Sequence, residues 1–234
     1  LVVFAVLELA GALTLKGRLR SRWPLVIVSA TMVPLAAVFG PEGQLWSLVG
    51  AIILAVLIRS GRAVLQPDSR PTTLPDIGVA VMVLAYIPFL AGFAVTVATS
   101  PGGVWWLFAG VVIVVSVDVA AYATGLSFGR TPLAPKISPK KTWEGFAGSL
   151  LAALVAGVLL GVFVLDVAWW AGVLLGAVLL GSATLGDLVE SLIKRDLGIK
   201  DISSWLPGHG GFLDRLDSML PSMAMLFVMF QIFG

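Results

Sequence analysis

The sequence predicts an all-α, polytopic helical membrane protein with about eight transmembrane helices. Of its 234 residues, 59% are hydrophobic and only 12% are charged, whereas soluble domains are usually about half apolar and about a quarter charged. The mean hydropathy of +1.03 comes from long apolar runs separated by short polar stretches. Because a helix needs roughly 20 apolar residues to cross the hydrocarbon core, each such run is a candidate span.

Eight segments are predicted on this basis: residues 1–15, 23–40, 44–59, 77–98, 104–126, 145–165, 168–190 and 212–233. The first segment lacks the basic start and the small-residue end of a signal peptide, so it is expected to be a membrane segment. The chain begins with Leu, which is compatible with a numbering that starts inside a longer gene product. No internal repeat or low-complexity linker divides the chain, so we expect residues 1–234 to form one integral membrane domain.

The basic residues predict the topology. All 15 lie in alternate connections, namely residues 16–22, 59–76, 127–144 and 191–217, whereas the other connections carry only Glu42 and Asp166 as charges. Cytoplasmic loops collect Lys and Arg, so we expect a multi-pass protein of the cell (inner or plasma) membrane with its polar loops in the cytoplasm. The net charge of +2 gives no reason to expect a nucleic-acid partner.

Acidic residues gather at the cytoplasmic ends of the last two segments. Asp187, Glu190 and Ser191 have the spacing of one helix face, and Asp214 and Asp217 are expected to share a face at the start of the last segment. Carboxylates suit a hard cation, Mg²⁺ before Zn²⁺. The alternative is that Asp214 and Asp217 merely favour the positive end of a helix.

Pro221 adds a further oxygen to this prediction. Proline cannot donate to the carbonyl four residues earlier, so the carbonyl of Asp217 is expected to be left free. The expected site therefore consists of oxygen ligands only, in agreement with a chain that contains no cysteine and a single histidine.

Two loops on the same predicted side carry groups that bind phosphate. GHGG at residues 208–211 leads into the segment that carries Asp214, and glycine amides at a helix start can approach an anion. The basic residues around it are Lys194, Arg195, Lys200 and Arg215. The second loop offers Lys136, Ser138, Lys140, Lys141 and Thr142. Either loop alone would more often attract lipid headgroups, but together with the carboxylates they predict a site for a polyphosphate–Mg²⁺ complex.

Three further polar residues stand out. His209 is interpreted as a phosphate or nucleotide contact rather than as a base. Asp118 lies inside a membrane segment with Tyr122 one turn further on, and such an acid is either functional or a hydrogen-bond partner for another helix. Glu8 in the first segment is similar but isolated, and no role is assigned to it.

These residues resemble a known family. The stretch from Ser191 to Asp217, which contains SLIKR, KD and HGGFLDRLD, resembles the signature of phosphatidate cytidylyltransferases, also called CDP-diacylglycerol synthases. LAPKISPKKTWEG at 133–145 and DVAAY at 118–122 resemble two more stretches of that family, although Val119 stands where the family usually has Thr or Ser. The resemblance covers about residues 118–220, the expected catalytic region, and residues 1–100 match only as hydrophobic segments.

The resemblance implies that CTP and phosphatidic acid react to give CDP-diacylglycerol and pyrophosphate, with Mg²⁺ required. Phosphatidate is a largely anionic phosphate monoester, so the reaction needs relief of anion repulsion rather than a strong base. Asp187 and Asp214 are then the principal cation ligands, with Asp217 as a ligand or a neighbour of one. A second cation sharing these carboxylates is also implied.

The remaining assignments follow from the same resemblance. Lys194 and Arg215 join the three aspartates as catalytic residues. The expected substrate-binding residues are Asp118, Ser138, Lys140, Lys141, Arg195, Lys200, His209, Gly210 and Gly211. Phosphatidate is expected to enter sideways from the inner leaflet, with its acyl chains staying among membrane lipids, because extracting them would cost about 0.8 kcal/mol per CH₂.

Three alternatives stay open at this point. One is a transferase for another lipid phosphate, since similar motifs would serve it. Another is a cation-coupled transporter, although no repeated, interrupted helices are seen and the acids cluster at one side of the membrane. The third is a structural membrane scaffold, which would not need glycine-rich loops beside carboxylates. A homodimer is compatible with the sequence, but nothing in the sequence calls for one.

Overall fold

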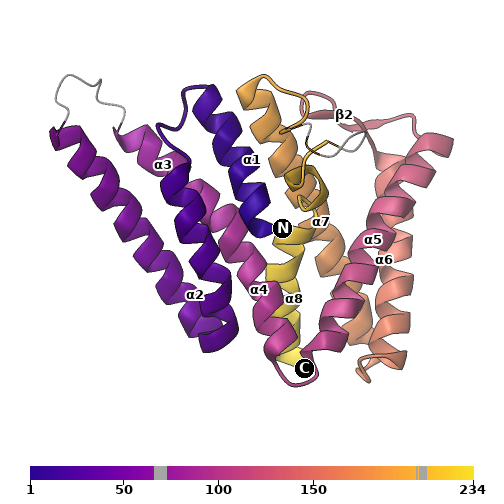
Figure 1. The fold of residues 1–234 in the computed structure, drawn as a ribbon. Helices are drawn as coiled ribbons and strands as arrows, with labels where there is room; N and C mark the ends of the chain where they lie inside the picture. Colours follow the sequence, from indigo (N-terminus) through magenta and orange to yellow (C-terminus); the bar gives the residue numbers. More distant parts are fainter. Residues whose placement is uncertain (66–72, 204, 206–209) are drawn as a thin grey trace. The chain divides into compact units, whose positions relative to one another are not determined.

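A computed structural model describes residues 1–65, 73–203, 205 and 210–234 of the chain. Nearly all of the regular structure in these residues is helical (Figure 1), which confirms the predicted all-α class. The exception is a short antiparallel hairpin of strands β1 (Pro132–Ala134) and β2 (Ser138–Thr142). Sequence reasoning did not predict this hairpin, which carries several of the residues proposed to bind phosphate.

The helices are α1 (Val2–Leu15), α2 (Trp23–Leu65), α3 (Thr73–Leu84), α4 (Leu90–Thr99), α5 (Gly103–Phe128), α6 (Trp143–Phe163), α7 (Trp169–Leu197) and α8 (Met219–Phe233). A π-helical turn, η1 (Ala85–Phe89), connects α3 to α4, and a 3₁₀ turn, η2 (Leu213–Arg215), precedes α8.

Five helical stretches of the described residues are long and apolar enough to cross a membrane, and α1 and α8 are shorter apolar helices. The five are α2, α3 with α4, α5, α6 and α7. The chain therefore has the make-up of a helical membrane protein, as predicted. The count of eight spans and the side on which each loop lies stay predictions.

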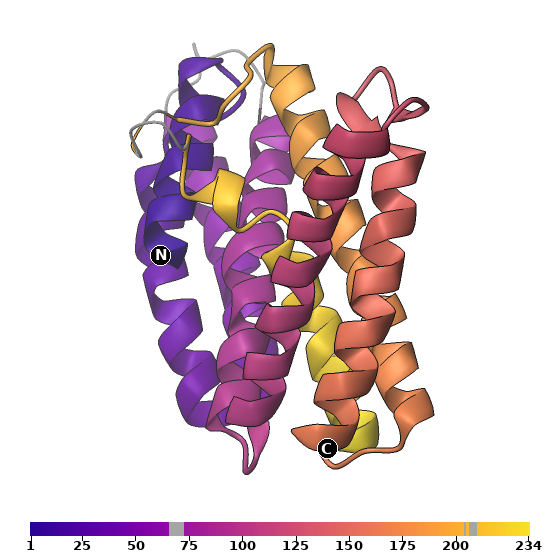
Figure 2. The same ribbon diagram turned by 90° about the vertical axis from the view of Figure 1, so that its right-hand side faces the viewer.

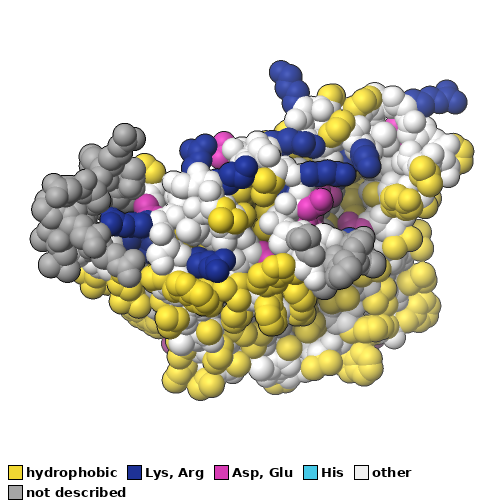
Figure 3. All heavy atoms as spheres, turned by 45° about the horizontal axis from the view of Figure 1, so that its top comes forward, with side chains coloured by type: hydrophobic (Ala, Val, Ile, Leu, Met, Phe, Trp, Pro, Cys, Tyr) yellow, Lys and Arg dark blue, Asp and Glu magenta, His cyan; other side chains and the backbone are white. Residues whose placement is uncertain are grey.

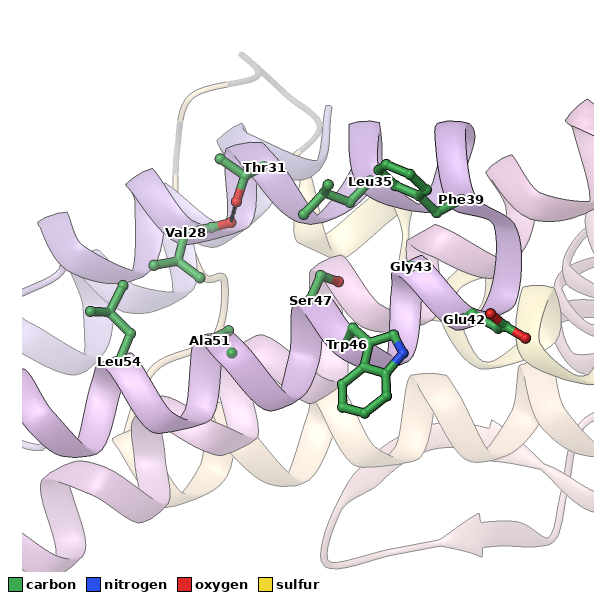
Figure 4. Close-up of a pocket in the computed structure, with 11 residues that line it drawn as sticks. Val28, Thr31, Leu35, Phe39, Glu42, Gly43, Trp46, Ser47, Ala51 and Leu54 are labelled. Carbon is green, nitrogen blue, oxygen red and sulfur yellow. Dashed lines mark hydrogen bonds between the residues drawn. The ribbon is translucent and has the colours of Figure 1, made fainter.

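Helix α2 folds back on itself at Gly40. This residue has φ 61° and ψ −148°, a conformation that residues with a side chain rarely adopt. The two arms on either side of Gly40 face each other (Figure 4). They correspond to the predicted segments 23–40 and 44–59, so the turn between those segments was predicted at the right place.

The arms of α2 enclose an apolar groove of about 490 Å³ whose lining includes Val28, Leu35, Phe39, Trp46 and Leu54 (Figure 4). Two hydroxyl groups in its wall are satisfied within their own helices: Thr31 Oγ1 donates to the Val28 carbonyl at 2.8 Å and Ser47 Oγ to the Gln44 carbonyl at 2.8 Å. Most of the groove lining is therefore apolar, with Glu42 as its one charged residue among those that line it.

The chain divides into two compact units, each built from two separate stretches. Unit 1 consists of residues 1–96 and 197–215, and unit 2 consists of residues 97–196 and 216–234. The single membrane domain expected from the sequence stays a prediction. Figure 3 shows Lys and Arg side chains exposed at the molecular surface, with exposed hydrophobic side chains beside them.

An ion pair closes the polar end of unit 1. Arg59 Nε on α2 lies 2.7 Å from Asp76 Oδ2 on α3, and the side chains are only 6% and 9% exposed. The other carboxylate oxygen of Asp76 accepts a hydrogen bond from the backbone N–H of Arg20 at 2.8 Å. Asp76 thus ties the loop after α1 to the ends of α2 and α3.

In unit 2, α5 and α6 lie side by side (Figure 2), and glycines bring α6 and α7 into close contact. A Cβ atom on Gly157 would lie 2.3 Å from the carbonyl oxygen of Gly172. At the start of α6, Thr142 Oγ1 caps the helix by accepting from Gly145 N at 3.1 Å. The Glu144 carboxylate accepts from Arg130 N at 3.1 Å and Thr131 N at 3.2 Å, which anchors the hairpin to this helix.

The predicted start of the last segment, residue 212, is wrong. Helix α8 begins at Met219, Asp214 lies in η2, and Asp217 lies in the turn between them. Asp214 and Asp217 therefore do not share one α-helical face. A physical reason lies in the turn itself: the Ser218 amide donates to the Asp217 carboxylate at 2.7 Å, and such local side-chain contacts compete with helical hydrogen bonds of the backbone.

Replacement of Asp76 by Ala should destabilise the protein, because it leaves the Arg59 charge buried without its partner. Loss of one member of a buried ion pair costs about 3–5 kcal/mol of unfolding free energy. Unfolding of the purified protein in mixed detergent micelles measures this cost. The double variant Arg59→Met/Asp76→Leu is the control and should lose less; equal stability of Asp76→Ala and wild type would contradict the role of this pair.

Candidate active site

The hairpin and helix α7 of unit 2 meet through opposite charges. Lys141 Nζ, at the end of β2, lies 2.5 Å from Asp187 Oδ2 on α7. Both side chains are partly exposed, at 24% and 32%. The sequence placed a cation ligand at Asp187 and a phosphate contact at Lys141, and the structure brings these two residues together.

One turn further along α7, Glu190 pairs with Lys194. Lys194 Nζ lies 2.7 Å from Glu190 Oε2, and the Glu190 side chain is fully buried. Ser191 Oγ lies 3.4 Å from Asp187 Oδ1 on the same helix. The predicted common face of Asp187, Glu190 and Ser191 is therefore confirmed, and Lys194 extends it.

Asp217 lies beside these acids, in the turn before α8. Burial and, second, the negative charge of Asp187 raise the pKa of the Asp217 carboxyl to about 6. A hydrogen bond with Glu190, one from the Ser218 amide and the charge of Lys194 act in the opposite direction. A cation beside the Asp217 carboxyl would favour its ionised form.

Gly186 sets the approach of α7 to the turn that contains Asp217. A Cβ atom at position 186 would lie 2.2 Å from the carbonyl oxygen of Asp217 and 2.9 Å from Pro221 Cγ. The carbonyl that Pro221 was expected to leave free therefore packs against α7. Because position 186 has no side chain, Asp187 can lie next to Asp217.

Asp118 on α5 has a protein partner. Its Oδ2 accepts a hydrogen bond from Ser218 Oγ at 3.0 Å, and Ser218 is the residue that immediately precedes α8. Of the two interpretations left open by the sequence, this contact supplies the hydrogen bond to another helix. The predicted contact of Asp118 with substrate stays a prediction.

The other basic residues of unit 2 lie around the hairpin. Arg195 Nε, near the end of α7, donates to the Ile137 carbonyl at 3.1 Å, so Arg195 holds the turn of the hairpin. Ser138 and Lys140 lie on β2, where Lys140 is exposed. These positions are compatible with contacts to an anionic substrate.

Unit 1 holds the glycine-rich part of the site. The backbone N–H of Gly211 donates to Asp214 Oδ2 at 2.7 Å. Gly210 has φ 78°, and a Cβ atom there would lie 2.8 Å from the same oxygen, so a glycine is required beside the Asp214 carboxylate. Lys200 and Arg215 are exposed in this unit. His209 lies outside the described residues.

The oxygen donors present suit a hard cation. Within the described residues, no three His, Asp or Glu side chains of the chain come together as a metal-binding group. Asp187 and Asp217 belong to unit 2 and Asp214 to unit 1, so the expected set of three is drawn from both units. Burial and, after it, the nearby charge of Asp187 raise the pKa of Asp217. The neighbouring oxygens of these two carboxylates are donors of the kind that a divalent cation takes.

Comparison with known proteins identifies the family. A family model described as the cytidylyltransferase family matches residues 1–233. The chain belongs to the cytidylyltransferase family. Two relatives named phosphatidate cytidylyltransferase, from Mycobacterium bovis and Mycobacterium tuberculosis, are each 40% identical over 210 residues, which is 85% of this chain and 67% and 63% of theirs. A protein of that name from Mycobacterium leprae is 46% identical over 156 residues, 67% of this chain and 50% of its own length.

This cytidylyltransferase chain thus spans about half to two thirds of the length of the curated relatives that it matches. The family predicted from residues 118–220 is confirmed. The match also extends over the first hundred residues, which the sequence motifs alone related to the family only as hydrophobic segments.

Sequence reasoning missed several residues that shape the site. Glu190 was placed on the right face but was not assigned to the site, although its i, i+4 spacing to Lys194 was a visible signal. Gly186 and Glu144 were not singled out. Glu8 was left without a role, although an acid in an apolar segment is a functional candidate by default.

Replacement of Gly186 by Ala should disturb the contact between α7 and the Asp217 turn, since the added methyl group meets a backbone oxygen. We expect a loss of about 1–3 kcal/mol in stability, as for other overpacked sites. The measurement is unfolding in detergent micelles.

Gly181→Ala on the same helix is the matched control, because a Cβ atom there has no neighbour within 4 Å. It should leave stability unchanged or raise it by up to about 1 kcal/mol through helix propensity. Equal effects of the two substitutions would contradict the close contact at Gly186.

Proposed function

We propose that the chain carries phosphatidate cytidylyltransferase activity, in which CTP and phosphatidic acid give CDP-diacylglycerol and pyrophosphate. Family membership and the names of the relatives support this activity. The structural observation that carries it is the contact between Lys141 and Asp187. This contact joins the hairpin motif at 133–145 to α7, four residues before the motif that begins at Ser191, and the resemblance assigns both residues to one reaction.

The chemistry suits these residues. An oxygen of the phosphatidate phosphate attacks the α-phosphorus of CTP, and the bond from that phosphorus to the bridging oxygen breaks to release pyrophosphate. Both reactants are anions, so the protein must reduce their repulsion and align them. Lys141 and Lys194 bring positive charge to the polar ends of β2 and α7, and in the proposal they hold phosphate groups during transfer. Arg195, Lys200 and Arg215 are assigned the same kind of contact.

We assign Asp187, Asp214 and Asp217 as the residues that would hold Mg²⁺, and a second cation that shares these carboxylates is part of the proposal. When bound, Mg²⁺ would neutralise charge that develops on the phosphate oxygens. Ser138, Lys140 and Gly210 with Gly211 are proposed substrate contacts around this centre. No base is required, because the attacking phosphate oxygen is already anionic.

The proposed location is the cell membrane, with the site on the cytoplasmic side. The apolar helices support insertion in a bilayer, and the complete segregation of Lys and Arg into alternate connections supports this orientation. Phosphatidate would then reach the site from the inner leaflet without leaving the lipid.

Asp214→Asn should abolish turnover while the protein still inserts and folds, because the amide keeps the shape of the side chain but loses the charge that a cation needs. We expect at least about a hundredfold loss. Purified protein is incubated with labelled CTP, phosphatidate and Mg²⁺, and label in the organic phase and free pyrophosphate are measured.

Asp166→Asn is the matched control for this assay. Asp166 is an exposed acid with φ 53°, a conformation that Asn tolerates well, so activity should be unchanged. Near-normal turnover of Asp214→Asn at saturating Mg²⁺ would overturn the metal assignment. A wild-type protein that transfers no label to lipid would overturn the proposed activity.

The orientation can be tested with single cysteines, since the chain has none of its own. Lys136 and Glu42 are both exposed, and the topology places them on opposite sides of the membrane. In right-side-out vesicles, a membrane-impermeant maleimide should label Glu42→Cys at once and Lys136→Cys only after the membrane is permeabilised. The reverse pattern would contradict a cytoplasmic site.

A further inference from the structure

A buried acid in unit 1 takes no part in the proposed chemistry. Glu8 lies in the middle of the apolar helix α1 and is 3% exposed. A carboxylate in such surroundings is costly unless its oxygens are hydrogen-bonded. Its partners should therefore reveal its role.

The partners of Glu8 lie far away in the sequence, in the glycine-rich loop. Its Oε1 accepts from Ser203 Oγ at 2.5 Å and from the backbone N–H of Phe212 at 3.0 Å. Its Oε2 accepts from the backbone N–H of Leu213 at 3.0 Å. One side chain of α1 thus contacts Ser203 and the two residues that directly follow Gly211.

The surroundings of the carboxylate are shaped to this contact. A Cβ atom at position 211 would lie 2.8 Å from Glu8 Oε2, so the glycine lets the loop backbone approach the carboxylate. Phe4, one turn before Glu8, stacks on Phe212 with ring centroids 5.3 Å apart and an angle of 21°. The rings of Trp205 and Phe4 are nearly perpendicular, at 81°, with centroids 6.3 Å apart. The same face of α1 therefore holds the loop by apolar and by polar contacts.

The anchored segment is the one that carries Asp214. Gly211 N donates to Asp214 Oδ2 at 2.7 Å, and the next two amides donate to Glu8. The two carboxylates thus bind successive amides of the loop and set its path. A shift of the amides held by Glu8 would move Asp214 directly.

We propose that Glu8 is a positioning residue for cytidylyl transfer, which acts by fixing the loop that presents the Asp214 carboxylate to the cation. This inference rests on the proposed function, because it uses Asp214 as a cation ligand. Glu8 itself touches neither nucleotide nor lipid phosphate in this scheme. A carboxylate is needed because both of its oxygens are acceptors, so it can face three donors at once.

Glu8→Gln tests the inference because it keeps the shape of the side chain but replaces one acceptor oxygen with an NH₂ group. That NH₂ group would face an N–H or O–H donor and could not accept its hydrogen bond. We expect turnover to fall by about tenfold to a hundredfold and the half-saturating Mg²⁺ concentration to rise by about tenfold or more. The KM for phosphatidate should change little. Hydrogen–deuterium exchange of the peptide 210–216 should be faster than in the wild type. Glu8→Asp keeps the charge and should recover part of the Mg²⁺ affinity.

Gln44→Leu is the matched control for a general loss of stability. Gln44 is also buried in unit 1, at 2% exposure. Its Nε2 donates to the Phe89 carbonyl at 2.6 Å and its Oε1 accepts from Thr96 Oγ1 at 3.3 Å, so these contacts tie it to η1 and α4 rather than to the glycine-rich loop. This variant should lower the melting temperature without changing the Mg²⁺ requirement. An equal change in Mg²⁺ requirement for Gln44→Leu and Glu8→Gln would overturn the positioning role.

Two readouts separate the inference from the proposed function. Unchanged amide exchange of peptide 210–216 in Glu8→Gln overturns the anchoring of the loop, whatever the enzyme activity is. Faster exchange with an unchanged Mg²⁺ requirement overturns the link to Asp214. Failure of the wild-type protein to convert CTP and phosphatidate overturns the proposed function instead, and this is seen without any variant.

Discussion

The cost of leaving charge uncompensated among apolar helices is the constraint on which the rest of the structure depends. A buried carboxylate or guanidinium must find a partner, because the surrounding hydrocarbon and apolar side chains cannot solvate it. Three buried acids of the described residues show how this is met: Asp76 with Arg59, Glu190 with Lys194, and Glu8 with backbone amides of the glycine-rich loop. These contacts join segments that are distant in the sequence or extend a helix face into the site.

The same constraint explains why the site lies at the polar ends of the helices. In unit 2, burial and then the nearby charge of Asp187 raise the pKa of the Asp217 carboxyl to about 6, and Lys141 Nζ lies 2.5 Å from Asp187 Oδ2. Under the proposed function, cations would bind at these carboxylates and phosphate groups at the lysines. Transfer between two anionic substrates needs both properties, which is why the arrangement suits a cytidylyltransferase of membrane lipids.

Close backbone contacts complete the arrangement. Gly186 lets the turn with Asp217 approach α7, and Gly211 lets the glycine-rich loop approach Glu8. In both cases a missing side chain brings a carboxylate within reach of its neighbours. The hairpin β1–β2 is held by hydrogen bonds instead: Glu144 accepts from the backbone at its base, and Arg195 donates to the backbone at its turn.

The sequence by itself determined the membrane class, the approximate positions of the apolar helices, the family and the set of charged residues, because hydrophobic length and motif spacing are local properties of the chain. It predicted the shared face of Asp187 and Glu190 for the same reason. Only the tertiary structure decided that α8 starts after Asp217, that Lys141 pairs with Asp187, and that Glu8 binds a loop about 200 residues away. These outcomes depend on which donors meet which acceptors in space, and apolar periodicity carries no information about that.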